Sequence, residues 1–369
     1  MKIRYLSAQI KKDLEKKMVF VAGPRQVGKT TLAKNFLSNE SGYLNWDIPP
    51  HRKKILTWEL PDTPLLIFDE IHKYRGWRNF LKGVYDDRKG RQKILVTGSA
   101  RLDLYRYGGD SLQGRYHHLH LFPLSVNELQ IKSQKDFLSL LDLSGFPEPF
   151  LGGSKQEAER WSTEYRSLVL REEITDLERI HDLGQMELLM LRLPDLVGSP
   201  LSINSLREDL QTSHKTLSRW VKILEKLYSL IRIYPFGAPK IRAVKKESKH
   251  YHFDWSVVSD PAARFENLVA IHLAKWVQFE VDTKGRPLEL RYFRDVDGRE
   301  VDFVVTEKSK PILFIECKWN DRDIDPSLNY LKTRFPDCTA WQISALGTKD
   351  YVKNKIHVSP ALLFLDSLI

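Results

Sequence analysis

Cysteine and long apolar runs are both scarce in this chain, and each scarcity excludes a class of protein. Only Cys317 and Cys338 occur among 369 residues, which excludes a disulfide framework and a cysteine-rich zinc site. Apolar runs such as MVFVA at 18–22 are far shorter than the ~20 residues that a membrane-spanning helix needs. The lysine-rich start lacks the apolar segment of a secretory signal, so we expect a cytoplasmic protein with no membrane partner.

Positive charge exceeds negative charge by ten, and the excess is unevenly distributed along the chain. Residues 1–130 hold 23 Lys and Arg against 13 Asp and Glu, and residues 200–249 hold 11 against 4. An excess of this sign predicts an anionic partner and says nothing about the fold. The hydrophobic content of 42% is enough for packed cores and excludes wholesale disorder.

The strongest motif lies near the N-terminus, where the predicted strand 18–22 runs into GPRQVGKT (23–30) and a predicted helix 31–36. This is the P-loop pattern in its required context, which disfavours a chance match. Gly23 and Gly28 let the backbone wrap a phosphate, Lys29 reaches the β- and γ-phosphates, and Thr30 ligates Mg²⁺. We therefore predict binding of ATP and Mg²⁺ by Gly23, Pro24, Arg25, Gln26, Val27, Gly28, Lys29, Thr30 and Thr31. Within the loop, Arg25 is expected to face a neighbouring subunit or loop.

A second motif, LLIFDE (65–70), is a predicted buried strand that ends in two carboxylates. Asp69 is predicted to hold Mg²⁺ through water, and Glu70 to polarise the attacking water. Without the P-loop upstream, such a pair would more simply be a solvated turn. A third predicted strand, KILVTGS (93–99), ends in Thr97 and Ser99, whose hydroxyls are expected to sense the γ-phosphate.

Five predicted strands, 18–22, 43–47, 65–70, 93–99 and 116–122, alternate with helices. The alternation predicts a parallel α/β sheet domain of the P-loop ATPase type, followed by a helical domain and a small α/β domain.

The negative charge on the transferred phosphate needs a cation to stabilise it. Arg115 is the candidate, as an arginine finger in trans or a sensor in cis, with a surface salt bridge as the alternative. Arg101 is a weaker candidate.

The middle of the chain is predicted to be mostly helical up to about residue 230, with GFPEPFLGG (145–153) as a turn. Residues 201–227 predict a helix-turn-helix, and 231–253 a strand pair with a basic tip that would form a wing. A basic stripe on the second helix predicts phosphate-driven, salt-dependent DNA contact by Lys215, Arg219, Lys222 and Lys226. The alternative is a solvated helix face.

Acidic residues recur in the last third of the chain. Glu266 lies on a predicted helix (264–277), Asp302 on a predicted strand (298–305), and Glu316 and Lys318 share one face of a strand (312–319). Two or three of these carboxylates would hold Mg²⁺, and the lysine would orient water for phosphodiester hydrolysis. The alternative is an ion pair in a domain that has lost its chemistry.

Together the motifs GPRQVGKTT, LLIFDEIHK, LVTGSA, LQGRY, HKTLSRWVKILEKL and EVDFVV–IECK resemble those of prokaryotic AAA+ ATPases. That family joins a P-loop domain to a winged helix and a PD-(D/E)xK nuclease-like domain, here 1–130, 131–255 and 256–369. The resemblance implies ATP and Mg²⁺ binding and a homo-oligomer, with a hexameric ring as one form. We expect an ATPase that binds and remodels DNA in repair, recombination or mobile-element defence. The alternatives are a nucleotide-dependent signalling switch with an inactive nuclease-like scaffold, and an ATP-gated nuclease.

Overall fold

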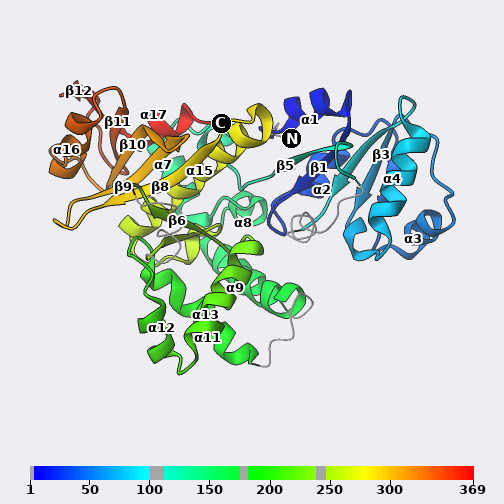
Figure 1. Ribbon diagram of the computed structural model, residues 1–369, viewed down its shortest axis with the longest axis horizontal. Coiled ribbons are helices and arrows are strands. Elements are labelled where there is room, and N and C mark those ends of the chain that lie inside the picture. The colour runs from blue at the N-terminus through cyan, green and yellow to red at the C-terminus, as the bar shows by residue number, and fades with distance from the viewer. Residues whose placement is uncertain (1–3, 100–111, 175–181, 238–246) are drawn as a thin grey trace. The chain divides into compact units, whose positions relative to one another are not determined.

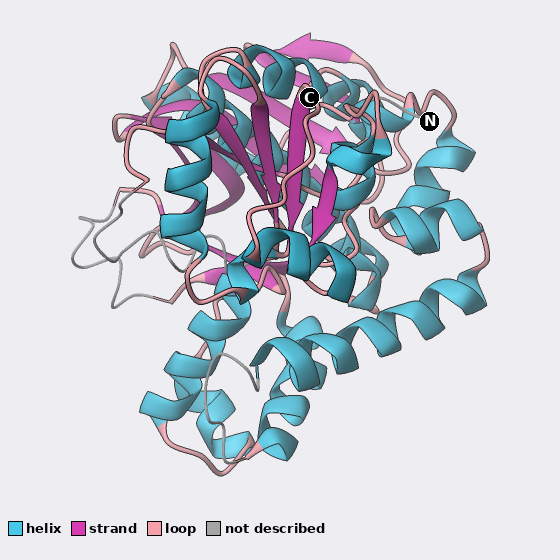
Figure 2. Ribbon diagram, turned by 90° about the vertical axis from the view of Figure 1, so that its right-hand side faces the viewer, coloured by secondary structure: helices cyan, strands magenta, loops and turns pink. Residues whose placement is uncertain are grey.

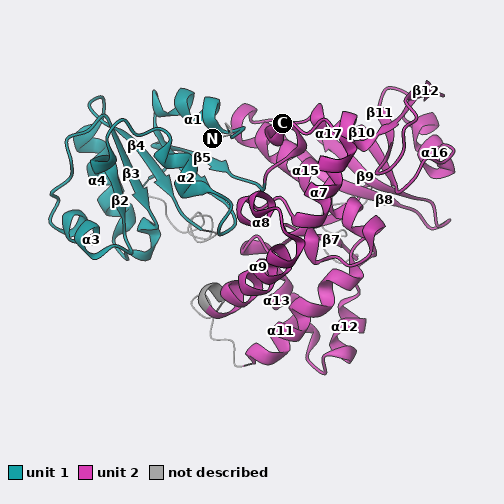
Figure 3. Cartoon of the chain, turned by 180° about the vertical axis from the view of Figure 1, so that it is seen from behind, with its two compact units in different colours: residues 1–123 teal, residues 124–369 magenta. Residues whose placement is uncertain are grey.

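The computed structural model describes residues 4–99, 112–174, 182–237 and 247–369. The chain forms two compact units, residues 1–123 and 124–369 (Figure 3). Helices and strands alternate in the first unit, whereas the second begins with helices and ends in a mixed sheet (Figures 1 and 2). No helix in the described ranges is long and apolar enough to cross a membrane.

The first unit is built on a five-stranded sheet in which every pairing is parallel. Its strands lie in the order β2-β3-β4-β1-β5. Their bounds are β1 Met18–Ala22, β2 Tyr43–Asn45, β3 Leu65–Asp69, β4 Lys93–Thr97 and β5 Tyr116–His120. All five predicted strands are present, and β4 separates the strand before the P-loop from the strand that ends in Asp69. The predicted fold class, with a P-loop ATPase sheet first, is confirmed.

Helices cover this sheet because its three central strands, β1, β3 and β4, are apolar and buried on both faces, as in most parallel sheets. The helices of the unit are α1 Ser7–Leu14, α2 Lys29–Lys34, α3 Pro49–Leu56 and α4 Trp77–Arg88, with 3₁₀ turns at Glu40–Gly42 and Ile71–Lys73. The apolar side chains of α4 recur at helical spacing and are buried: Trp77, Phe80, Leu81 and Val84. They pack in one core with Phe20, Phe68 and Val96 of the sheet. Helix α1 contacts β1 and β4, and α2 contacts β3 and β4.

The second unit begins with helices, several of which start at a serine. The hydroxyls of Ser125, Ser133, Ser154, Ser202 and Ser213 each accept a hydrogen bond from a backbone N–H of the first turn. The helices are α6 Val126–Leu129, α7 Gln134–Leu143, α8 Pro147–Gly152, α9 Lys155–Leu168, α11 Leu183–Arg192, α12 Ile203–Asp209 and α13 His214–Lys226. A π-helical turn, Val169–Ile174, follows α9, and a 3₁₀ turn, Leu193–Leu196, follows α11. The prediction of a turn at 145–153 was wrong. Pro147 starts α8 there, since proline is well tolerated in a first helical turn.

Helices α12 and α13 are followed by two antiparallel strands, β6 Leu230–Pro235 and β7 Lys249–His252. Helix α13 buries an apolar stripe that includes Leu217, Val221 and Leu224. The order helix, helix, strand, strand is the one that a winged helix has. The predicted basic tip of the wing falls on 238–246, outside the described residues. Assignment as a winged helix stays a prediction.

An eight-stranded mixed sheet ends the second unit, in the order β12-β13-β11-β10-β9-β8-β6-β7. Its later strands are β8 Leu288–Arg294, β9 Glu300–Glu307, β10 Lys310–Lys318, β11 Thr339–Ser344, β12 Tyr351–Lys353 and β13 Ile356–Pro360. The helices are α15 Pro261–Lys284, α16 Pro326–Arg334 and α17 Ala361–Asp366, with a 3₁₀ turn at Trp255–Val257. Strand β6 joins through its end, where Tyr234 pairs with Arg291 of β8. The sheet therefore continues across the boundary expected at 255, and the three-domain division stays a prediction.

Candidate functional site

The P-loop connects β1 to α2, and glycine is required at two of its positions. Gly28 has a left-handed backbone with φ 98°, and Gly23 has φ 149°. A Cβ at Gly23 would overlap the backbone carbonyl of Leu121. The loop turns tightly between strand and helix, and only glycine fits the backbone angles at these positions and the close approach of Leu121 at Gly23.

Lys29 is buried, with only 7% of its surface exposed, and its ammonium lies inside the loop. Nζ donates to the carbonyl oxygens of Gly23 at 2.9 Å and Pro24 at 2.6 Å. A lysine held this way can exchange two neutral acceptors for phosphate oxygens with little movement. The other predicted loop residues, Arg25, Gln26, Val27, Thr30 and Thr31, lie around it in the same turn and the start of α2.

The carboxylate of Asp69 at the end of β3 is held by side chains from three other elements. Thr30 of α2 donates to Oδ2 at 2.8 Å, and Thr97 of β4 donates to Oδ1 at 2.6 Å. Two residues of β2 also donate to Oδ2, Tyr43 at 2.7 Å and Asn45 at 3.3 Å. The structure thus brings Thr30, Asp69 and Thr97 together as the sequence predicts. It adds Tyr43 and Asn45, which no motif marks.

Glu70 follows Asp69 directly and turns the chain out of the sheet with φ 56°, a left-handed conformation. Its N–H donates to the carbonyl of Thr97 at 3.0 Å. Its Oε2 lies 3.5 Å from His72 Nε2 and 3.6 Å from Lys73 Nζ. Burial raises the pKa of Glu70 above its ordinary value, against the opposing charges of Lys29 and Lys73. A carboxyl with a raised pKa is a better proton acceptor once ionised.

The oxygens at this site fit the Mg²⁺ that the P-loop implies. The hydroxyl of Thr30 and the carboxylate of Asp69 are hard oxygen donors 2.8 Å apart. Mg²⁺ takes one or two such protein oxygens together with waters and phosphate oxygens. These two residues would hold the ion.

Three further predicted residues are placed less simply. Arg115 precedes β5, and its carbonyl accepts from the N–H of Met18 at the amino end of β1, whereas the P-loop follows the carboxyl end. Arg115 therefore lies at the opposite end of β1 from the loop, which disfavours the cis-sensor role, and its guanidinium pairs with Asp86 at 3.0 Å. A role in trans stays a prediction. Ser99 is buried beyond β4. Arg101 lies outside the described residues.

A buried arginine that the sequence did not single out donates hydrogen bonds to the P-loop backbone and to the chain after β5. Arg4 is 8% exposed, and its Nη1 donates to the carbonyl of Val27 at 2.8 Å. Its Nη2 donates to the carbonyl of Phe122 at 2.5 Å, after β5. One side chain thereby ties the loop to the strand end beside it. No pattern in the sequence around Arg4 predicts these contacts.

The basic side chains predicted to form a stripe on α13 do share one exposed face of that helix. The four side chains are all exposed, on the face opposite the buried apolar stripe: Lys215, Arg219, Lys222 and Lys226. Helix α13 therefore presents positive charge while its other face packs. Whether this face contacts DNA stays a prediction.

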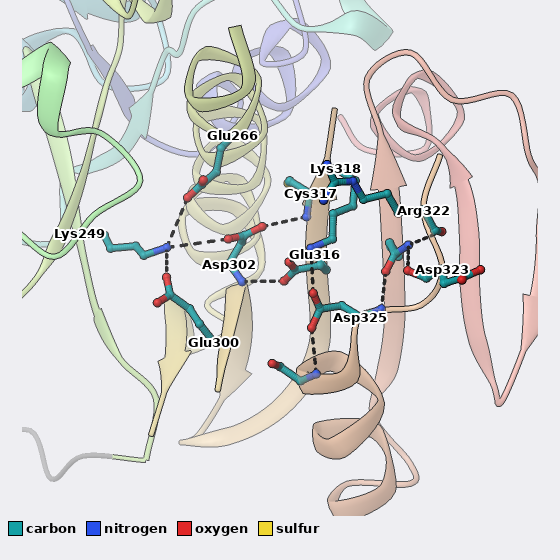
Figure 4. Close-up of polar contacts among 12 residues, drawn as sticks. Lys249, Glu266, Glu300, Asp302, Glu316, Cys317, Lys318, Arg322, Asp323 and Asp325 are labelled. Atoms are coloured by element: carbon teal, nitrogen blue, oxygen red, sulfur yellow. Dashed lines mark hydrogen bonds and ion pairs between the residues drawn. The ribbon is translucent and has the colours of Figure 1, made fainter. Parts of the chain in front are cut away.

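The four residues of the predicted nuclease site also come together (Figure 4). Lys318 Nζ lies 2.7 Å from Glu316 Oε1, so these two share a face of β10. The N–H of Asp302 donates to Glu316 Oε2 at 3.3 Å, which joins β9 to β10. Glu266 of α15 is linked to Asp302 through Lys249. Burial raises the pKa of Glu316 to about 7, against the opposing charge of Lys318.

Additional charged residues in this cluster were not predicted. Lys249 of β7 and Glu300 of β9 pair at 2.5 Å, and Asp325 at the start of α16 pairs with Lys318 at 2.8 Å. Burial would lower the pKa of Lys249, but Glu266 and the other nearby carboxylates raise it above its ordinary range. Glu300 could have been found because it lies two positions before Asp302 and so shares its face. Lys249 has no such signal.

The cluster does not fit the Mg²⁺ that the nuclease resemblance implies. Among the residues that the structure describes, no group of three or more His, Cys, Asp or Glu side chains is arranged to hold a metal ion. The expectation that Glu266, Asp302 and Glu316 hold Mg²⁺ is therefore disfavoured and stays a prediction. A lysine ammonium lies among the carboxylates instead.

Known families match three consecutive stretches of the chain. Residues 15–130 match the family described as an AAA domain. Residues 134–264 and 262–363 match two families, each described as a domain of unknown function, DUF8612 and DUF4143. The AAA match coincides with the parallel sheet and the P-loop, so the first unit has an AAA-type P-loop ATPase fold.

Two curated proteins are similar over most of the chain. The uncharacterized proteins Rv2008c of Mycobacterium tuberculosis and Mb2031c of Mycobacterium bovis are both 23% identical over 328 residues, covering 84% of this chain and 73% of each protein. Among solved structures, the Walker-type ATPase PABY2304 of Pyrococcus abyssi has a TM-score of 0.43 and 17% identity, covering 72% of this chain and 98% of that one. The ORC1 protein of Aeropyrum pernix, solved in complex with DNA, has a TM-score of 0.35 and 12% identity, covering 72% and 92%.

Replacing Tyr43 by phenylalanine is expected to lower kcat for ATP hydrolysis by about tenfold and to change KM by less than about threefold. The variant keeps the ring that packs under Lys34 but removes one donor to Asp69. A hydrogen bond to a charged group contributes roughly 1.5–3 kcal/mol, and about 1.4 kcal/mol is tenfold in rate. Steady-state kinetics at saturating and limiting Mg²⁺ measure it, with Tyr85→Phe on α4 as the matched control. An unchanged kcat with a lowered melting temperature would make Tyr43 purely structural.

Proposed function

We propose that the chain is an ATPase which uses Mg²⁺-dependent hydrolysis of ATP to bind and remodel DNA as a homo-oligomer. One observation carries the ATPase: the carboxylate of Asp69, at the end of β3, accepts hydrogen bonds from Thr30 of the P-loop and from Thr97 of β4, and Lys29 of the same loop is buried. The AAA-domain match over 15–130 supports the same activity.

Each residue of this site has a task in the proposed reaction. The loop backbone and Lys29 bind the phosphates. The phosphate oxygens then take the place of the two carbonyl oxygens to which the ammonium of Lys29 donates. Thr30 and Asp69 hold Mg²⁺, which when bound neutralises charge on the phosphates. Thr97 keeps Asp69 oriented. Glu70 orients the attacking water and accepts its proton.

DNA binding is proposed from charge. The first 130 residues carry the whole net excess of +10, and α13 presents four exposed basic side chains along one face. Such surfaces bind phosphates without reading bases, so the affinity should fall steeply with salt. Assembly into an oligomer is proposed from the resemblance to AAA+ ATPases, with Arg115 offered to the neighbouring subunit in trans.

ATP turnover measured with single-stranded, duplex and four-way DNA at two salt concentrations tests the proposal. We expect hydrolysis to increase with at least one DNA, and the increase to shrink at the higher salt. Each lysine that contacts a phosphate adds about one to the slope of log K against log salt. Lys222→Ala/Lys226→Ala should therefore lower that slope by about two.

The matched control removes two exposed lysines from elsewhere in the second unit, Lys135→Ala/Lys155→Ala. This variant has the same net charge as the α13 variant and should keep the wild-type slope. Equal slopes for both variants would remove α13 from the DNA interface. Turnover that is slow and indifferent to every DNA would remove DNA from the proposal.

A second candidate is a nucleotide-dependent switch whose C-terminal domain is a scaffold. The observation that favours it is the lysine among the carboxylates of the nuclease-like cluster, which speaks against phosphodiester hydrolysis there. In that case ATP binding would control protein contacts, and turnover would be slow with and without DNA.

A further inference from the structure

The carboxylates of the C-terminal cluster surround a lysine that comes from a different part of the chain. Lys249 of β7 is 1% exposed. Its Nζ lies 2.5 Å from Glu300, 3.4 Å from Glu266 and 3.8 Å from Asp302 (Figure 4). The ammonium is thus enclosed by three carboxylates from α15 and β9.

Several carboxylate oxygens of the cluster also accept from other donors. The second oxygen of Asp302 accepts from the N–H of Cys317 at 2.8 Å, and Glu266 Oε1 accepts from the hydroxyl of Tyr251 at 2.6 Å. On the far side, Lys318 bridges Glu316 and Asp325. A divalent ion needs about six oxygens at roughly 2.1–2.5 Å. The carboxylate oxygens named here already bind an ammonium group, a hydroxyl or a backbone N–H.

We propose that Lys249 is the resident cation of this cluster, with its ammonium in the position between Glu266, Glu300 and Asp302 that a divalent cation would otherwise take. The two cannot be present together, because a doubly charged ion a few ångströms from a buried ammonium is strongly repelled. Conversely, buried carboxylates without a cation are costly, so removing the ammonium creates a demand for another positive ion.

The consequence is a centre that ties three elements together without metal. Lys249 belongs to the strand pair that follows α13, and its partners lie on the α15 helix and the central sheet. The ion pairs therefore fasten the region of the predicted wing to the nuclease-like region. This inference goes beyond the proposed function and stands whether or not the first unit hydrolyses ATP.

Binding of Mn²⁺ to the full chain without nucleotide, followed by the EPR signal of the free ion, tests the proposal. Wild type and Asp302→Asn are expected to bind Mn²⁺ equally, since the cluster takes none. Lys249→Met should bind one more equivalent per chain, and Lys249→Met/Asp302→Asn should lose it. Lys310→Met, which removes an exposed lysine of β10, should gain none. Any ion at Thr30 and Asp69 is common to all variants and cancels.

Two outcomes overturn the proposal: wild type binds an equivalent that Asp302→Asn loses, or folded Lys249→Met gains none. Folding of Lys249→Met is followed by circular dichroism, and its melting temperature should rise with Mn²⁺ while that of wild type does not. If Lys249→Met does not fold with or without Mn²⁺, the comparison of wild type with Asp302→Asn decides. Equal binding there supports the proposal, and binding that depends on Asp302 sinks it.

Discussion

Lys29→Ala is expected to weaken ATP binding by about a hundredfold. The ammonium is buried and already aimed into the loop by the carbonyls of Gly23 and Pro24, so little is lost in positioning it on phosphate. A hydrogen bond between charged groups contributes up to about 3 kcal/mol, and roughly 1.4 kcal/mol is tenfold in affinity. Titration of the protein with a fluorescent ATP analogue in the presence of Mg²⁺ measures the change.

The control for this prediction is Lys34→Ala. It removes the same charge from the same helix, but at an exposed position over the ring of Tyr43. Its ATP affinity should stay within about threefold of wild type, because exposed charges contribute little. If Lys29→Ala binds ATP as tightly as Lys34→Ala does, the P-loop does not grip the phosphates through this lysine.

The first unit could be predicted from the sequence almost element by element. Its strands are short apolar runs such as MVFVA, which is followed by Gly23, and LLIFD, which is followed by Glu70. The same reasoning failed at 145–153, where two prolines and three glycines suggest a turn. There Pro147 and Pro149 fall in the first turn of α8, where proline costs no hydrogen bond.

Residues that complete the two sites from neighbouring strands could not be predicted. Tyr43 and Asn45 reach Asp69 because β2 pairs with β3 in register, with Asn45 opposite Asp69. Lys249 reaches Asp302 because the strand pair after α13, β6 and β7, joins the same eight-stranded sheet as β9. Both depend on which strands are neighbours, and this information is absent from any local pattern.

Two ion pairs that the sequence offered as alternatives are present in the structure. The surface salt bridge proposed for Arg115 is present, with Asp86 as its partner. The ion pair of Lys318 with Glu316 is also present. A motif predicts which residue types come together, but the competing donors and cations around them decide whether a ligand has room.

Glu70→Gln is expected to lower kcat for ATP hydrolysis by about 10²- to 10⁴-fold while ATP affinity stays within about threefold of wild type. Glutamine keeps the shape of Glu70 and its left-handed turn but cannot accept the proton of the attacking water, and a positioned general base contributes a factor of this size. Single-turnover hydrolysis and ATP binding, measured on the same preparation, separate the two effects. Glu59→Gln, the same change at an exposed position, should leave both unchanged.

The pH dependence of hydrolysis distinguishes a proton acceptor from a residue that only shapes the site. Because burial raises the pKa of Glu70, its carboxylate takes up a proton at a higher pH than an exposed glutamate does. The protonated form cannot activate water, so the wild-type rate should fall as the pH is lowered through that raised value. Glu70→Gln should lack this decline, since nothing remains to titrate. A variant that hydrolyses ATP at the wild-type rate, or that keeps the same acid limb, would take Glu70 out of the reaction.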